Sequence, residues 1–116
     1  NPKAEIAAIV DPTAHPTSPM NPDMQSVAAL SELYDAPAFD SLDELLATGM
    51  ALDGVVVGTN HASHHELATK AMSAGLHVMC EKPMTVDIDE AKDLVAKASA
   101  TDKVFMVNHP HLTFQL

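Results

Sequence analysis

The sequence has little positive charge, and this limits the partners that it can bind. Its 116 residues contain six Lys and Arg against sixteen Asp and Glu, a formal net charge of -10 at pH 7. Such a surface repels a phosphate backbone and carries no basic stripe that could release counterions from nucleic acid. We therefore expect no nucleic-acid partner.

Long apolar runs and paired cysteines are also missing. The longest apolar stretches, residues 6–10 and 55–57, are far shorter than the ~20 residues needed to cross a bilayer, so we expect no membrane insertion. A single cysteine, Cys80, can form no internal disulfide, and nothing indicates an oxidising compartment. We expect a soluble chain, cytoplasmic by default. Residues 1–5 contain neither a signal peptide nor an initiator Met, so organellar targeting stays an alternative.

Apolar runs alternate with helical patterns along the chain. The continuous runs at residues 6–10 and 54–58 predict strands buried on both faces. Apolar residues that recur at three and four positions predict helices between the strands. Strands joined by helices indicate parallel βαβ units, so the expected fold class is α/β, a doubly wound and mostly parallel sheet with helices on both sides. Further short strands are predicted at residues 38–39, 77–80 and 104–107.

Four helix starts are predicted from capping residues. Asn21, followed by Pro and Asp, predicts a helix that runs to about Tyr34. Ser41 and Ser63 are each followed three residues later by Glu, which is a capping box, and Asp87 opens the last helix. In that last helix, the residues predicted to face inward are Ile88, Ala91, Leu94, Val95 and Ala98, and those predicted to face outward are Asp93 and Lys97.

Polar residues follow the predicted strands, where doubly wound sheets bind their ligands. Asp11 could accept hydrogen bonds from a ribose diol, or it could cap its own turn. Lys82 could act as a proton donor or hold a substrate hydroxyl, or it could be the exposed start of a turn. The polar groups at these positions are Asp11, Thr59-Asn60-His61, Glu81-Lys82-Pro83 and Asn108-His109.

The seven histidines raise the question of a metal site. His61 and His65 lie four residues apart but lack the His-Glu-x-x-His order, and spacing fixes no third ligand. We therefore expect no metal ligand. Cys80 lies inside a strand pattern and is expected to be a small buried apolar residue.

Residues 53–109 carry a specific series of motifs. Asp-Gly-Val-Val-Val-Gly-Thr-Asn is followed by His64, then by Ala-Gly-Leu-His-Val-Met-Cys-Glu-Lys-Pro at residues 74–83, and finally by Met-Val-Asn-His. This series resembles the Rossmann domain of the glucose-fructose oxidoreductase and inositol dehydrogenase family (Gfo/Idh/MocA). Residues 5–11 and 41–46 are similar to the family as well, so the resemblance covers essentially the whole chain.

The resemblance implies the cofactor and the roles of several residues. Asp11 would hold the adenosine ribose and favour NAD over NADP, because an acid would repel a 2′-phosphate. Lys82 would be the catalytic residue that contacts the cofactor and the substrate hydroxyl, and its bond to Pro83 is expected to be cis, as it commonly is in the family. The complete set of cofactor-binding residues implied by the resemblance is Asp11, Thr59, Asn60, His64, Glu81, Lys82 and Asn108.

The sequence also departs from the family pattern. The chain has four glycines, none in the G-x-G-x-x-G arrangement that cradles the pyrophosphate. The family's first strand is missing with that turn, and the Arg usually found shortly after the last strand is absent from residues 108–114. We therefore interpret residues 1–116 as part of an NAD(P)-binding Rossmann domain, without the C-terminal α+β substrate domain through which relatives form homo-oligomers.

Two functions are compatible with this reading. The first is an NAD(P)-dependent oxidoreductase that moves a hydride between a nicotinamide and a hydroxyl-bearing carbon of a sugar, polyol or related small molecule. The alternative is a catalytically inactive family member that serves as a structural or interaction subunit of a larger assembly.

Overall fold

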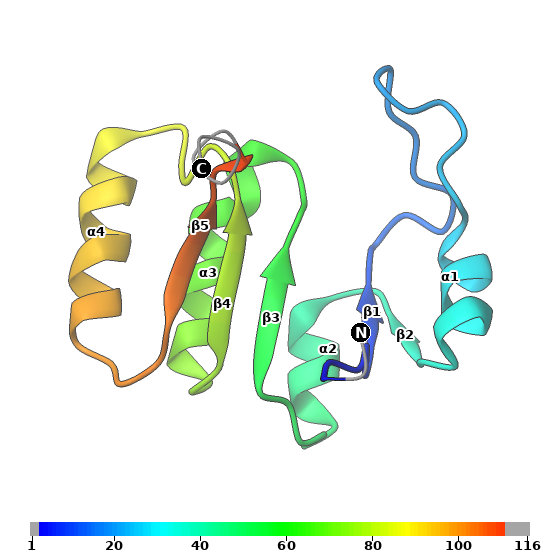
Figure 1. Ribbon diagram of the computed structural model, residues 1–116, viewed down its shortest axis with the longest axis horizontal. Helices are drawn as coiled ribbons and strands as arrows, with labels where there is room; N and C mark the ends of the chain where they lie inside the picture. The colour runs from blue at the N-terminus through cyan, green and yellow to red at the C-terminus, as the bar shows by residue number, and fades with distance from the viewer. Residues whose placement is uncertain (1–2, 111–116) are drawn as a thin grey trace. The chain divides into compact units, whose positions relative to one another are not determined.

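The computed structural model describes residues 3–110. The chain divides into two compact units, and the boundary in the sequence lies between Ala51 and Leu52 (Figure 1). The first unit contains β1 (Ile9–Val10), α1 (Val27–Tyr34), β2 (Ala38–Phe39) and α2 (Leu42–Ala47). The second contains β3 (Gly54–Val57), a short 3₁₀ helix, η1 (His61–Ser63), α3 (His64–Ser73), β4 (His77–Glu81), α4 (Ile88–Ser99) and β5 (Phe105–Asn108).

In the first unit, β1 and β2 form a short parallel pair. Ile9 lies opposite Ala38, and the N–H of Asp11 donates to the carbonyl oxygen of Phe39 at 3.1 Å. The strand predicted over residues 6–10 is therefore shorter than expected and only half-buried, because its two-residue partner limits the length of the ladder. The last ladder bond places Asp11 directly at the carboxyl end of β1.

The helix predicted to start at Asn21 starts later. α1 follows Ser26, whose Oγ accepts a hydrogen bond from the N–H of Ala29 at 3.1 Å. Asn21 instead donates its N–H to the carbonyl oxygen of Ser18 in a turn. Ser26 immediately precedes the apolar helix segment, so its cap bond is the one that serves a packed helix.

The capping box predicted at Ser41 is confirmed. Its Oγ accepts from the N–H of Glu44 at 3.1 Å, and the Glu44 carboxylate accepts from the N–H of Asp40 at 3.0 Å. In a standard capping box the Glu44 carboxylate would accept from the N–H of Ser41, whereas here it accepts from the N–H of the preceding residue. Two N–H groups at the start of α2 are still satisfied.

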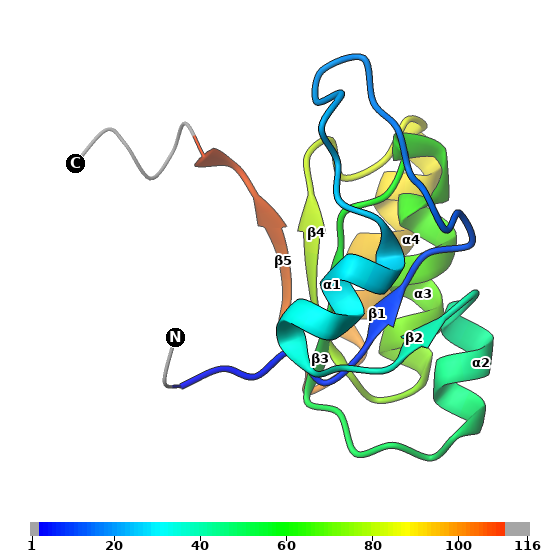
Figure 2. The same ribbon diagram turned by 90° about the vertical axis from the view of Figure 1, so that its right-hand side faces the viewer.

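The second unit is a parallel sheet in the order β3-β4-β5. Val57 lies opposite Cys80, and Cys80 opposite Val107, so the three strands end close to one another. Figure 2 shows α3 and α4 together on one face of this sheet. The parallel α/β arrangement predicted from the alternating pattern is confirmed. The fully buried core residues of this face are Val57, Ala68, Ala71, Val78, Cys80 and Leu94.

The prediction that β3 is buried on both faces is wrong. Its residues alternate, with Val57 buried and Val56 66% exposed. Val56, Met79 and Met106 lie side by side in register on the face away from α3 and α4, and Met106 is 49% exposed. Within residues 52–110, helices therefore cover one face of the sheet, not both.

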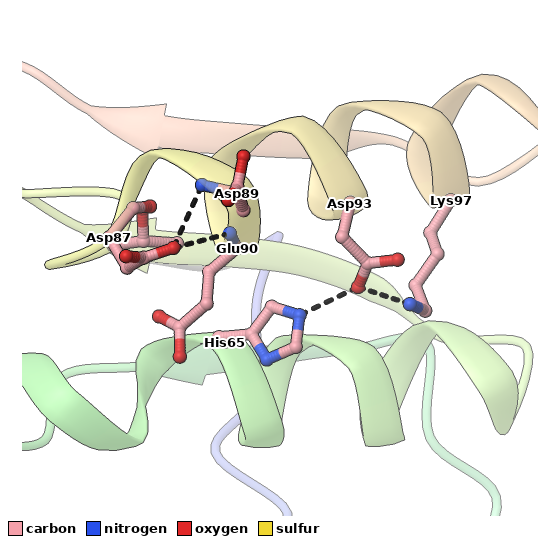
Figure 3. Close-up of polar contacts among 7 residues, drawn as sticks. His65, Asp87, Asp89, Glu90, Asp93 and Lys97 are labelled. Carbon is pink, nitrogen blue, oxygen red and sulfur yellow. Dashed lines mark hydrogen bonds and ion pairs between the residues drawn. The ribbon is translucent and has the colours of Figure 1, made fainter.

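α3 and α4 are joined by a hydrogen bond between His65 and Asp93 (Figure 3). His65 Nε2 of α3 lies 2.6 Å from an Asp93 carboxylate oxygen of α4, and the Lys97 ammonium contacts the same oxygen. The hydrogen bond from Lys97 is the main cause, and that from His65 the second, of a pKa of Asp93 that lies below its usual range. The side chains of Asp93 and Lys97 are 41% and 38% exposed, so the predicted outward position holds in part, and Asp93 also reaches His65 of α3.

The inward face of α4 also differs from the prediction. Leu94 is fully buried, whereas Ile88 and Val95 are 68% and 54% exposed. Leu94 lies at one edge of the predicted apolar stripe but at the centre of the buried side, so the helix is rotated toward α3. The predicted N-cap is confirmed, since Asp87 accepts from the N–H groups of Asp89 and Glu90 at 2.8 and 3.1 Å (Figure 3).

The close approach of β3 and β4 predicts unequal effects of two Gly→Ala substitutions. A Cβ at Gly54 would lie 2.9 Å from the carbonyl oxygen of His77, whereas one at Gly58 would meet nothing within 4 Å. We expect Gly54→Ala to lower the free energy of unfolding by about 1–3 kcal/mol, because the strands must move apart. Gly58→Ala should leave it unchanged or raise it slightly. Urea denaturation followed by circular dichroism tests this, and equal stabilities would contradict the prediction.

The lowered pKa of Asp93 predicts a pH-dependent stability. Because the folded chain favours the ionised carboxylate, its contribution is complete above the pKa of the unfolded chain and is lost as pH falls through the lower folded pKa. Asp93→Asn should therefore melt below the wild type at neutral pH, with the difference shrinking below about pH 4. Asp89→Asn is the control, because this carboxylate is more exposed and its one ion pair among the described residues is with Lys92. A melting-temperature difference independent of pH would refute the linkage.

Candidate functional site

The carboxyl ends of β3, β4 and β5 lie at one edge of the second unit. Because the strands are parallel and in register, the residues that follow them meet there, as the sequence predicts. Six of the seven predicted site residues belong to this unit: Thr59, Asn60, His64, Glu81, Lys82 and Asn108. The seventh, Asp11, lies at the end of β1 in the first unit.

The turn after β3 is closed by its own hydrogen bonds. Thr59 Oγ1 lies 2.7 Å from Ser63 Oγ, and Asn60 Oδ1 accepts from the N–H of Ser63 at 3.2 Å. Ser63 makes no side-chain cap on α3, so the capping box predicted there is wrong and Asn60 is the side chain that caps η1. Thr59 and Asn60 are exposed, and this local network holds them at the edge of the sheet.

His64 is enclosed behind this turn. Its side chain is fully buried, Nδ1 lies 2.8 Å from the carbonyl oxygen of Pro83, and Nε2 lies 3.2 Å from that of Thr59. The ring thus has no exposed surface with which to contact a ligand. Sequence reasoning missed Pro83 as its partner, because a backbone acceptor nineteen residues away leaves no side-chain signal.

Glu81 and Asn108 form a polar pair across β4 and β5. They are register partners, and Asn108 Nδ2 donates to a Glu81 carboxylate oxygen at 2.6 Å. This bond fixes both side chains, which are half-buried, at the carboxyl edge. The pairing was not predicted, although both residues were.

Lys82 directly follows β4 and is exposed. Its peptide bond to Pro83 is cis, as predicted. Within residues 3–110 no hydrogen bond or ion pair engages its ammonium group, whereas the carboxylate of Glu81 is bound to Asn108. Lys82 therefore presents a cation at the edge of the sheet that can interact with a ligand.

Cys80 is an apolar core residue, as predicted. It is fully buried, and burial, followed by the charge of the adjacent Glu81, raises the pKa of its thiol. A raised pKa keeps the thiol protonated at neutral pH, so Cys80 is not an activated nucleophile.

Asp11 is half-buried and caps its own turn. One carboxylate oxygen accepts the N–H of Thr13 at 2.8 Å, which is the simpler of the two readings of the sequence. The residue also lines an open depression of about 750 Å³ in the first unit, together with Asp35 and Asp40. A carboxylate can accept further hydrogen bonds through its second oxygen, so the turn and a ribose contact are compatible.

The histidines do not gather into a metal-binding group in the part of the chain that the structure describes. His61 and His64 stack edge to face with their ring centroids 5.7 Å apart, and His65 is bound to Asp93. None of the helices within residues 3–110 has the length and apolar character needed to cross a bilayer.

The family model described as "Oxidoreductase family, NAD-binding Rossmann fold" matches residues 1–109. The chain belongs to this Gfo/Idh/MocA family. The Gfo/Idh/MocA resemblance of the sequence is therefore confirmed, as are the Rossmann fold class and NAD as the cofactor of the family.

Relatives within the Gfo/Idh/MocA family include sugar and polyol dehydrogenases. Inositol 2-dehydrogenase of Leifsonia xyli is 36% identical over 100 residues, covering 86% of this chain and 26% of the relative. UDP-N-acetylglucosamine 3-dehydrogenase of Acidithiobacillus ferrooxidans is 39% identical over 72 residues, covering 62% and 22%. The crystal structure of the WlbA dehydrogenase from Bordetella pertussis, in complex with NADH and UDP-GlcNAcA, matches with a TM-score of 0.74 and 28% identity, covering 92% and 28%. The chain thus spans about a quarter of the length of these proteins.

The residues present fit one part of the Gfo/Idh/MocA cofactor better than another. Thr59, Asn60 and the Glu81–Asn108 pair place neutral and acidic polar groups beside the Lys82 cation, which suits a ribose and a nicotinamide. No G-x-G-x-x-G turn for the pyrophosphate occurs in the sequence. Of the segment in which the family usually carries an Arg, residues 111–114 lie outside the described residues.

Proposed function

We propose that the full-length protein containing this chain is an NAD-dependent dehydrogenase that oxidises a hydroxyl-bearing carbon of a sugar, polyol or related small molecule. The observation that carries the proposal is the position of Lys82, exposed and without an ionic partner among residues 3–110, at the carboxyl edge of a parallel sheet. The names of the relatives, inositol 2-dehydrogenase and UDP-N-acetylglucosamine 3-dehydrogenase, support the substrate class.

Lys82 is the catalytic residue in this proposal. When bound, NAD supplies the hydride acceptor. The substrate hydroxyl passes its proton to a general base, which we assign with the rest of the substrate pocket to the full-length protein, and the Lys82 ammonium donates a hydrogen bond to the hydroxyl oxygen that stabilises the negative charge developing there. Glu81 and Asn108 hold each other, and with Thr59 and Asn60 they offer hydrogen bonds to the ribose and nicotinamide.

Asp11 is the residue that we propose to select NAD over NADP. Its carboxylate would accept hydrogen bonds from the adenosine ribose diol and would repel a 2′-phosphate at the same position. Because the chain spans about a quarter of its relatives, we assign the substrate pocket to the full-length protein and not to these residues alone.

Substitution of Lys82 tests the catalytic assignment. In the full-length protein, Lys82→Ala should lower turnover of NAD⁺ with myo-inositol or UDP-N-acetylglucosamine about 10²–10⁴-fold, because the hydrogen bond and the charge that stabilise the developing alkoxide are lost. NADH affinity, measured by fluorescence titration, should change by only a few fold. Lys92→Ala is the matched control, since Lys92 is exposed on α4 and, within residues 3–110, pairs only with Asp89. Turnover that survives Lys82→Ala would overturn the assignment, and a full-length protein that binds no NADH would favour an interaction subunit.

Substitution of Asp11 tests cofactor choice. Asp11→Ser should raise the affinity for NADPH relative to NADH roughly tenfold, because it removes a like-charge repulsion from the 2′-phosphate. Asp40→Ser is the control, since Asp40 is a second acid that lines the same depression. Titration of the full-length protein with both reduced cofactors measures the ratio. An unchanged ratio in Asp11→Ser, or an equal shift in Asp40→Ser, would count against a specific role.

A further inference from the structure

His64 contacts two loops that carry proposed cofactor and substrate groups. It is the first residue of α3, yet its ring nitrogens face the carbonyl oxygens of Pro83, at 2.8 Å, and Thr59, at 3.2 Å. Pro83 follows Lys82 in the loop after β4, and Thr59 lies in the turn after β3. One fully buried side chain therefore joins the ends of two neighbouring strands.

This connection has no substitute among the described residues. Within residues 3–110, no hydrogen bond other than those of His64 links the turn at 58–63 to the loop at 82–87. The strand pairing ends at Val57 and Cys80 for these two strands. Beyond that point, the position of the loop backbone around Lys82 relative to β3 depends on the imidazole.

The two contacts are not equivalent. Both facing atoms are carbonyl oxygens, which only accept, so a ring nitrogen must carry a proton to bond either of them. We assign a proton to Nδ1, because its contact with Pro83, at 2.8 Å, is shorter than the 3.2 Å contact of Nε2 with Thr59. The stronger bond of His64 is therefore the one next to Lys82.

We propose that His64 is a positioning residue for Lys82. By donating from Nδ1 to the carbonyl oxygen of Pro83, it fixes the loop backbone from which the Lys82 side chain projects toward the substrate. This inference rests on the proposed function of Lys82, and it assigns His64 to the support of the catalytic group in place of direct contact with the cofactor. A buried carbonyl oxygen that loses its hydrogen-bond donor is left unsatisfied, and the energetic cost of this is large enough to displace a loop.

Two substitutions separate the two contacts of the ring. The amide nitrogen of Asn can occupy the place of Nδ1 and keep the bond to Pro83, whereas the amide nitrogen of Gln reaches the place of Nε2 and keeps the bond to Thr59. His64→Asn should therefore preserve the position of Lys82, and His64→Gln should not. His65→Asn is the matched control, because it removes the contact between α3 and Asp93 without touching either carbonyl.

The first measurement needs no cofactor. In the full-length protein, amide hydrogen exchange of residues 82 and 84–86 should be about tenfold faster or more in His64→Gln than in the wild type, and within about threefold of the wild type in His64→Asn. His65→Asn should lower the melting temperature and leave exchange at these four residues unchanged. Equal exchange in His64→Asn and His64→Gln, or the same acceleration in His65→Asn, would overturn the proposal.

The second measurement is the division between kcat and KM in the full-length enzyme. His64→Gln should lower kcat about tenfold with little change in NADH affinity, and His64→Asn should restore it. If Lys82→Ala keeps full turnover, the proposed function fails while the exchange data still report on His64. If Lys82→Ala is inactive but His64→Gln turns over normally, the positioning role alone fails.

A third measurement keeps the proposal testable if neither variant folds. The ¹⁵N spectrum of the wild-type imidazole should show the proton on Nδ1, with slow exchange and a scalar coupling to the Pro83 carbonyl carbon. A proton on Nε2, with Nδ1 as the unprotonated nitrogen, would overturn the proposal.

Discussion

The register of β3, β4 and β5 is the constraint on which the candidate site depends. Val57, Cys80 and Val107 lie opposite one another, so the next residues along each strand arrive together at one edge. A slip of one residue would turn Cys80 out of the core and carry Glu81 away from Asn108. The buried, fully packed Cys80 and Val78 make that slip costly, and the polar edge is held in place by the apolar core beneath it.

Much of the fold could be predicted from the sequence because its signals are local. The cap at Asp87, the box at Ser41 and the alternation of strands with helices depend on residues within a few positions of each other. The start of α1 could not be chosen this way, because Asn21 and Ser26 both have the chemistry of a cap. The choice depends on which of them precedes a helix face that packs, and packing is not a local property.

The sequence was least informative where two elements meet. Continuous apolar residues in β3 are compatible with burial on one face or on two, and Val56 shows that one face is exposed. The rotation of α4 brings Asp93 to His65, which lies twenty-eight residues away in the sequence. The six candidate site residues of the second unit are predictions from motif and strand position, and the contacts that hold Glu81, Asn108 and His64 were not predicted, because their partners lie on other elements.

The neighbouring charges of Glu81 and Lys82 explain why the bonds around them are arranged in this way. An adjacent carboxylate would neutralise the ammonium if the two groups paired, but within residues 3–110 no ion pair joins Glu81 to Lys82. Asn108 then engages the Glu81 carboxylate across the strand at 2.6 Å. Glu81 is thus occupied by a neutral amide, and the Lys82 charge is left for an oxygen of a ligand. Within residues 3–110 no polar contact restrains the ammonium group of Lys82, so the backbone decides where this side chain lies. The buried imidazole of His64 is important because it contacts that backbone at Pro83.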